Sequence, residues 1–256
     1  MRLIVTWGSS GAGKTTVSMA LAAALAARHR DVLVLSSDTR TPALPVMLPT
    51  VKDLDERNSA GPLFTMEDIS EAALKNRLVR HPRSSRIFCM GLASGEATSM
   101  RYGTPVRDSV IALFHLLHQT PFHYVIVDGD SFPLYDQTTL AAMEYANAAL
   151  AVLTPDVKGY EFWKAQRSWL DNSDIFRIGR FIRLASPVFP YTPLSDARAV
   201  FGGFDFELPH APEVAERMMA GELLSGFSTS AALRWEAQLR LLTDRIEREE
   251  IVNDGK

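Results

Sequence analysis

The sequence predicts an α/β fold with a doubly wound, mostly parallel sheet and helices on both faces, in three layers. Segments of strand length alternate along the chain with longer segments of helical period. The strand-length segments are apolar throughout, which is typical of strands buried on both faces of a parallel sheet. Hydrophobic residues make up 46% of the 256 residues and charged residues 22%, which is ordinary for a folded protein with a sizeable core. We therefore expect a single domain over residues 1–256.

The strands and helices follow one another in the order that such a fold requires. A first strand is expected at residues 3–7, and an Ala- and Leu-rich helix at residues 15–28. Further strands are expected at residues 31–36, 86–91, 124–127, 148–153, 180–184 and 204–208. Further helices are expected at residues 105–119, 140–146, 162–170 and 231–250.

Residues 41–67 break this alternation, because they contain four prolines and little periodicity. Long irregular segments are often functional; a surface excursion packed on the domain is the alternative, and the sequence leaves both open. The C-terminal helix at 231–250 has Leu233, Leu239, Leu242 and Ile246 on one side and glutamates in its last turns. A helix lying on a membrane surface carries Lys and Arg there instead, so we expect this helix to dock on its own domain.

Composition excludes several classes of protein. The net charge of −3 gives no overall attraction to nucleic acid or to an anionic membrane. Cys89 is the only cysteine, which excludes an internal disulfide, a cysteine-rich zinc site and a CxxC redox pair. The chain enters a glycine turn at Gly8, too early for the apolar core of a signal peptide. No apolar helical stretch reaches the roughly 20 residues that span a bilayer, so we expect a cytoplasmic protein without a transmembrane segment.

A glycine-rich loop follows the first predicted strand. Its sequence, Gly8-Ser9-Ser10-Gly11-Ala12-Gly13-Lys14-Thr15, matches the P-loop motif G-x-x-x-x-G-K-[ST]. Small residues let consecutive backbone N–H groups surround phosphate oxygens, and the following helix directs its N-terminal dipole at the same place. Lys14 adds a positive charge for the β- and γ-phosphates, and the Thr15 hydroxyl is a ligand for Mg²⁺. The sequence therefore predicts a nucleotide-binding loop.

Two aspartates follow apolar strands and complete the predicted site. Asp128 ends the strand at 124–127, and Asp38 comes soon after the strand at 31–36. The carboxyl end of a parallel strand faces the ligand crevice. We expect Asp128 to hold Mg²⁺, directly or through a water, and Asp38 to orient or deprotonate the attacking water. A helix cap or turn is the alternative role for Asp128, and an Asx-turn for Asp38.

Several segments carry motifs that occur together in one family. Residues 11–16, GAGKTT, are similar to G-V-G-K-T-T; residues 122–128, FHYVIVD, are similar to F-D-Y-V-I-V-D; and residues 151–156, AVLTPD, are similar to V-V-T-P-D. Residues 34–38 fall where the second strand of that family ends in a hydrolytic Asp, and residues 208–214 resemble the I-P-x-D-P-x-V turn near the base pocket. The chain thus resembles the ParA/MinD family of deviant Walker A, SIMIBI-class P-loop ATPases, and within it the CpaE/TadZ pilus-localisation branch.

The resemblance implies an ATP- and Mg²⁺-binding ATPase that forms a homodimer. Its nucleotide state would control the localisation or assembly of a protein partner in a pilus, secretion or cell-positioning system, and a partner could recruit it to the membrane or cell pole. Lys14 and Asp38 would be catalytic, and Thr15 and Asp128 would bind the metal. The nucleotide-binding residues would be Gly8, Ser9, Ser10, Gly11, Ala12, Gly13, Lys14, Thr15, Thr16 and Pro209.

The sequence departs from the family pattern at three places. Ser9 stands where relatives carry a signature lysine that reaches the partner's phosphates across a nucleotide-sandwich dimer. Ser36 replaces a frequent acidic residue, and residues 181–185 lack the Asn-Arg pair with which many relatives read adenine. A nucleotide-binding scaffold with little or no hydrolysis is therefore a second hypothesis; in the first, another cation such as Arg40 takes the place of the lysine.

A basic segment and an aromatic group leave further alternatives open. Residues 75–86 hold five cations and no acid. They could dock DNA phosphates or an acidic partner, which would fit a DNA-partitioning ATPase, or form a solvated helix end. Tyr160, Phe162, Trp163 and Trp169 lie at near-helical spacing, and we expect most of them to belong to the core rather than to an interaction surface.

Overall fold

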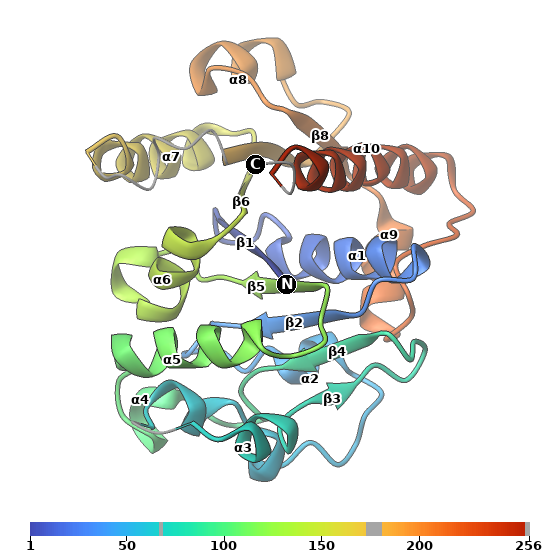
Figure 1. Cartoon of the computed structure of the whole chain (residues 1–256). Coiled ribbons are helices and arrows are strands. Elements are labelled where there is room, and N and C mark those ends of the chain that lie inside the picture. The colour runs from blue at the N-terminus through green and yellow to red at the C-terminus, as the bar shows by residue number, and fades with distance from the viewer. Residues whose placement is uncertain (67–68, 173–180, 254–256) are drawn as a thin grey trace.

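An eight-stranded sheet forms the centre of the protein (Figure 1). The computed structural model describes residues 1–66, 69–172 and 181–253. The strands are β1 (Arg2–Gly8), β2 (Val32–Ser36), β3 (Val79–Arg80), β4 (Ile87–Met90), β5 (Tyr124–Asp128), β6 (Ala148–Leu153), β7 (Phe181–Val188) and β8 (Phe206–Pro209). They lie in the order β3-β4-β2-β5-β1-β6-β7-β8, and among the described residues only β3 runs antiparallel to its neighbour. The predicted doubly wound, mostly parallel sheet is confirmed.

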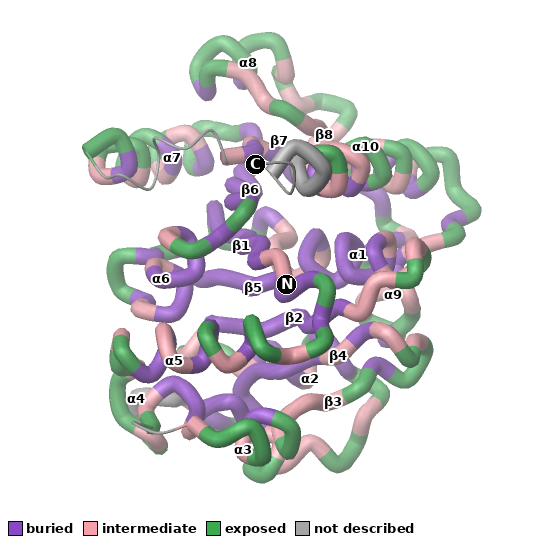
Figure 2. Tube along the Cα trace, in the orientation of Figure 1, coloured by how far each residue is buried: buried purple, intermediate pink, exposed green. Residues whose placement is uncertain are grey.

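Helices cover both faces of this sheet, as predicted. They include α1 (Lys14–Ala27), α5 (Arg107–His118), α6 (Gln137–Tyr145), α7 (Val157–Leu170) and α10 (Ser230–Asn253), and the shorter α8 (Leu194–Phe201) and α9 (Pro212–Met219). The apolar core has two parts, one between the sheet and the helices α1 and α10, the other between the sheet and the helices α5, α6 and α7. Figure 2 shows the central strands as a buried layer between these helices.

Strand register brings the predicted site residues to one edge of the sheet. Asp128 at the end of β5 pairs with Thr6 of β1 on one side and with Ser36 of β2 on the other. The loops that follow these three strands therefore begin at the same level. That is why the P-loop, Asp38 and Asp128, which are far apart in sequence, meet at the carboxyl edge of the sheet.

The predicted boundaries hold for some elements and differ by several residues for others. Strand β6 occupies the predicted residues 148–153, whereas α7 begins at Val157 instead of 162 because the Asp156 side chain caps it by accepting from the Gly159 N–H. Strand β7 extends past the predicted 184 to Val188, and its predicted first residue, 180, lies outside the described residues. The sequence did not predict the short elements α3 (Glu71–Lys75), α4 (Thr98–Arg101), α8, α9 and β3.

The structure describes residues 41–66 of the irregular segment. This part of the chain packs on the sheet and also reaches the site. It contains α2 (Leu44–Met47) and two 3₁₀ turns, η1 (Glu56–Asn58) and η2 (Gly61–Phe64). Leu44, Met47 and Phe64 are buried. The C-terminal helix docks on its own domain, as predicted: α10 packs against α1 and β8. Arg28, the C-cap residue of α1, forms ion pairs with Asp244 and Glu247 of α10.

The aromatic segment is built into the fold, whereas the basic segment is in part exposed, at Lys75, Arg80 and Arg83. Lys75 ends α3 and pairs with Glu71, Arg77 donates to the Ala73 carbonyl, and Arg86 pairs with Asp31. The basic segment is therefore only in part a helix end, since β3 and a turn follow α3. The expectation for the aromatics is confirmed, because Trp163 is buried and packs with Phe162 against Trp7.

Gly8 is a position that only glycine fits. Its φ is +138°, and a Cβ built on it would lie 1.9 Å from the Val152 carbonyl oxygen of β6. Gly8→Ala is expected to lower the free energy of unfolding by more than about 3 kcal/mol, because rigid backbone on both strands must move. Chemical denaturation measures this loss.

Gly11→Ala is the matched control, since Gly11 also has a positive φ but a Cβ there meets nothing within 4 Å. Gly11→Ala should lower the free energy of unfolding only by the conformational strain, about 1 kcal/mol. Equal losses in the two variants would show that the close approach of β1 and β6 does not explain Gly8.

Candidate nucleotide-binding site

A cleft of about 510 Å³ lies at the carboxyl edge of the sheet. It lies where the P-loop meets the loops that follow β2 and β5. Its walls are polar, and they are formed by Ser10, Gly11, Gly13, Lys14, Thr15, Asp38, Arg40, Thr41, Ala43, Asp128, Gly129, Asp130, Ser131 and Phe132. The structure therefore brings together the predicted catalytic pair, Lys14 and Asp38, and the predicted metal ligands, Thr15 and Asp128.

The P-loop backbone has the conformation that anion binding requires. Gly11 and Gly13 both have positive φ, at +77° and +86°. Gly13 precedes α1, and no side chain caps that helix end. The first N–H groups of α1 are thus available for a ligand, and the helix dipole favours a negative one. The loop and the helix end together thus present backbone N–H groups to which an anion can bind.

Lys14 already has partners in the cleft. Its Nζ donates to the Ser131 hydroxyl at 2.8 Å and to the Ser9 carbonyl at 3.4 Å. Burial lowers the pKa of Lys14, while the charges of Asp128, Asp130 and Asp38 oppose that shift. The ammonium group is therefore held by neutral oxygens within a ring of carboxylates, and phosphate oxygens can replace those neutral partners.

Asp128 and Thr15 form the predicted metal-binding pair. The Thr15 hydroxyl donates to one carboxylate oxygen of Asp128 at 2.7 Å, and Ser18 and Thr6 donate to the other at 3.1 and 3.3 Å. Burial raises the pKa of Asp128, because a buried charge lacks solvation. A hydroxyl and a carboxylate are the hard oxygen ligands that Mg²⁺ prefers, and the phosphates of a substrate commonly complete its shell. The residues therefore fit Mg²⁺.

Asp38 forms the Asx-turn that was the alternative to a catalytic role, and it also lines the cleft. Its Oδ1 accepts hydrogen bonds from the N–H groups of Arg40 and Thr41, both at 2.9 Å, which is an Asx-turn. The same side chain lines the cleft opposite Lys14. Because both hydrogen bonds go to Oδ1, the turn leaves Oδ2 outside it. The turn therefore fixes the position of the carboxylate without using both of its oxygen atoms.

Ser9 is buried in the scaffold and does not line the cleft. It is 4% exposed, and its hydroxyl accepts a hydrogen bond from the Thr154 N–H at 3.1 Å. Its own N–H donates to the Val152 carbonyl at 3.0 Å. Both contacts tie the start of the P-loop to the end of β6. The position at which relatives carry the signature lysine thus has a structural role in this chain.

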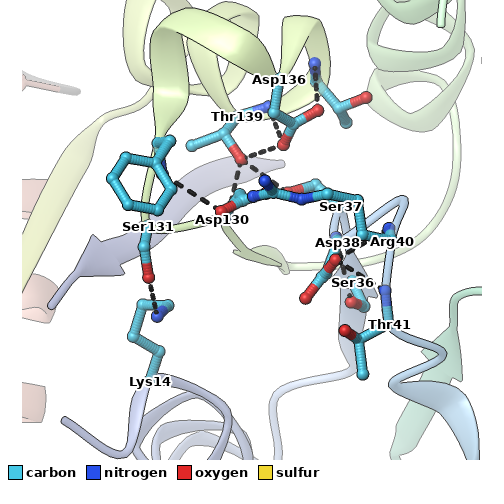
Figure 3. A network of polar contacts seen from close by, with 12 residues as sticks. Lys14, Ser36, Ser37, Asp38, Arg40, Thr41, Asp130, Ser131, Asp136 and Thr139 are labelled. Carbon is cyan, nitrogen blue, oxygen red and sulfur yellow. Dashed lines mark hydrogen bonds and ion pairs between the residues drawn. The ribbon is translucent and has the colours of Figure 1, made fainter. Parts of the chain in front are cut away.

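Sequence reasoning missed a polar network behind the cleft (Figure 3). The Thr139 hydroxyl is hydrogen-bonded to Ser37 at 2.7 Å and to the buried Asp136 carboxylate, and it accepts from the Asp130 N–H at 2.9 Å. Asp136 also caps α6. The signal in the sequence was the run Asp128-Gly129-Asp130-Ser131 directly after an apolar strand.

Pro209 does not reach the phosphate cleft. It is the last residue of β8, and the adjacent His210 ring stacks on Phe189 with centroids 4.5 Å apart.

A second cavity, of about 590 Å³, lies between the start of α7 and α8 and is lined by aromatic and proline side chains such as Tyr160, Phe189 and Pro187. None of the described residues that line it is a cation, so we assign the phosphates to the smaller cleft, where Lys14 and Arg40 lie. Of the other expected binding residues, Gly8, Ser9, Ala12 and Thr16 are not among the lining residues either.

The chain matches a known family over most of its length. The model of the CobQ/CobB/MinD/ParA nucleotide binding domain matches residues 3–233. The protein therefore belongs to this family of nucleotide-binding domains, and the ParA/MinD resemblance is confirmed at that level. The comparisons do not distinguish the CpaE/TadZ branch.

Solved structures share the fold at low sequence identity. The septum site-determining protein MinD from Pyrococcus horikoshii, complexed with Mg-ADP, superposes with a TM-score of 0.71 at 16% identity, covering 96% of this chain and 98% of that one. A ParA family ATPase from Chlorobium tepidum gives 0.73 at 12% identity, covering 95% and 99%. A variant of McdA from Cyanothece in complex with ATP gives 0.67 at 16% identity, covering 96% of each chain.

Two further comparisons give negative findings. No curated protein sequence matches the chain. Across residues 1–66, 69–172 and 181–253, no helix combines the length and apolar character that crossing a bilayer needs.

Proposed function

We propose that this protein is an Mg²⁺-dependent ATPase of the MinD/ParA type whose nucleotide state controls the localisation or assembly of a partner. The observation that carries the proposal is the Thr15–Asp128 pair directly beneath the P-loop, with Asp38 in the same cleft. The related structures with Mg-ADP and with ATP support the choice of nucleotide and metal. We infer that residues 1–256 act as one domain, because α10 docks on α1 near the other end of the chain.

We infer the following roles for the residues of this chain. The P-loop N–H groups and Lys14 bind the phosphates, and Thr15 and Asp128 hold Mg²⁺. Mg²⁺, when bound, neutralises charge on the transferring phosphoryl group. Asp38 orients the attacking water through the carboxylate oxygen outside its turn. Catalysis would consist of positioning and electrostatic stabilisation.

The proposed control of a partner depends on the loop after β5. Asp130 and Ser131 contact the cations of the cleft, and the next residues, Phe132, Leu134 and Tyr135, are exposed. Exposed apolar groups of this kind form contact surfaces. A change in the phosphates of the bound nucleotide would thus alter a surface that a second copy of the chain or a protein partner can bind. A homodimer, the CpaE/TadZ branch and recruitment to the membrane or cell pole are parts of this proposal.

The hydrolytic role of Asp38 gives the test. Asp38→Ala is expected to lower ATP turnover by about 10² to 10⁴, because general-base positioning is lost, while ATP affinity stays close to that of the wild type. Steady-state phosphate release measures turnover. Asp53→Ala is the control, because Asp53 is an exposed aspartate of the 41–67 segment that does not line the cleft. Turnover that is unchanged in Asp38→Ala removes Asp38 from the mechanism.

A nucleotide-binding scaffold with little or no turnover is the second candidate. The observation that favours it is Ser9, whose buried side chain takes the place of the signature lysine. The scaffold predicts that phosphate release by the wild type equals that of Lys14→Ala, with or without candidate partners. Turnover in the wild type that disappears in Lys14→Ala supports the ATPase.

A further inference from the structure

Arg40 is the second positive charge in the phosphate cleft. Of the described residues that line the cleft, only Lys14 and Arg40 are cations. Arg40 follows the Asp38 turn, and its own N–H is one of the two groups that hold the Asp38 carboxylate. Its side chain extends from that turn to Asp130, where the guanidinium lies (Figure 3).

Two adjacent residues of the loop after β5 hold the two cations. Asp130 accepts from the Arg40 guanidinium, and Ser131 accepts from the Lys14 ammonium. The loop itself is fixed: Asp130 is 6% exposed, its N–H donates to Thr139, and its carboxylate accepts from the Phe132 N–H at 3.1 Å. Asp130 and Ser131 thus present oxygen atoms to the groups that would otherwise bind phosphate oxygens.

A phosphate can displace Asp130 from Arg40. The Arg40 side chain is 57% exposed and that of Asp130 only 7%, so the arginine can turn toward a ligand in the cleft while the carboxylate keeps its hydrogen bond from the Phe132 N–H. A guanidinium binds phosphate through two parallel N–H groups. A triphosphate also carries more negative charge than one carboxylate, so it is the stronger ligand for a group that the cleft leaves half exposed.

We propose that Arg40 is a phosphate-binding residue that acts within its own subunit, and that Asp130 holds it until the γ-phosphate of a nucleoside triphosphate takes it over. The inference rests on the proposed function only in requiring a triphosphate in the cleft. It explains how a chain with Ser9 at the lysine position can still supply a second cation. It also makes the loop after β5 respond to the γ-phosphate, because both Lys14 and Arg40 leave that loop when they bind nucleotide.

The test compares the affinities of a non-hydrolysable ATP analogue and of ADP, each with Mg²⁺, by isothermal titration calorimetry. Arg40→Ala is expected to weaken the analogue about tenfold or more and to leave ADP within about twofold. Asp130→Asn is expected to tighten the analogue, because Arg40 no longer has a competing carboxylate. In the double variant, Asp130→Asn should add nothing to Arg40→Ala. Arg57→Ala, an exposed ion-paired arginine outside the cleft, is the control.

The outcomes separate this proposal from the proposed function. Equal loss of ADP and analogue affinity in Arg40→Ala, or no loss of either, overturns the role of Arg40. A tightening by Asp130→Asn that persists without Arg40 overturns the exchange between the two. Failure of the wild type to bind either nucleotide overturns the proposed function itself. If Arg40→Ala does not fold, the double variant, which removes both charges, is compared with Asp130→Asn instead.

Discussion

Lys14→Ala is expected to weaken ATP binding and to lower turnover at least about a hundredfold, the usual loss when one charge-stabilising donor is removed from a reacting group. Lys14 is the cation at the P-loop itself, and its present partners are a hydroxyl and a backbone carbonyl. In the variant, Arg40 is the one cation left among the described residues that line the cleft, and it cannot bind the γ-phosphate from its own position and also take the place of Lys14. Calorimetry and phosphate release measure the two effects.

Lys52→Ala is the control for Lys14→Ala, since it removes the same group at an exposed position outside the cleft. Near-normal values are expected for it in both assays. If Lys14→Ala keeps its ATP affinity and its turnover, the cleft is not the site at which nucleotide binds.

Asp128→Asn is expected to remove the dependence of ATP affinity on Mg²⁺. The carboxamide keeps an acceptor for the hydroxyls around it but loses the charge that a divalent cation needs. Wild-type affinity should fall when Mg²⁺ is chelated, whereas that of Asp128→Asn should be equally weak in both conditions. Titration with ATP in Mg²⁺ and in a chelator checks this.

The metal-binding role of Thr15 provides a matched pair of variants for the same assay. Thr15→Ser keeps the hydroxyl that donates to Asp128 and should keep the response to Mg²⁺. Thr15→Ala loses the hydroxyl and should behave like Asp128→Asn. A full Mg²⁺ response in Asp128→Asn would contradict the assignment of the metal to this pair.

The parts of the site that the sequence predicts are those set by local pattern and by sheet register. The P-loop is contiguous, and Asp128 ends an apolar strand, so both could be assigned from residue order. Their meeting follows from the parallel pairing of β1, β2 and β5, which aligns Asp128 with Thr6 and Ser36. The long strands and helices could also be predicted, because each contains enough residues to show its hydrophobic periodicity.

The parts that the sequence does not predict depend on loop conformation. The pairs Arg40–Asp130 and Lys14–Ser131 join loops from different strands, and neither pair belongs to a spacing pattern. The contact of Ser9 with Thr154 depends on how β1 and β6 approach each other at Gly8. Short helices such as α8 and α9 carry too few periodic residues to be recognised, and tertiary packing determines where they form.

Calorimetric titration of the wild-type protein with ATP tests whether the cleft at the P-loop binds ATP together with Mg²⁺. Saturable binding is expected, strong with Mg²⁺, much weaker in a chelator, and lost in Lys14→Ala. Absence of binding by the folded wild-type protein at millimolar ATP with Mg²⁺, or equal binding by Lys14→Ala, would contradict this expectation.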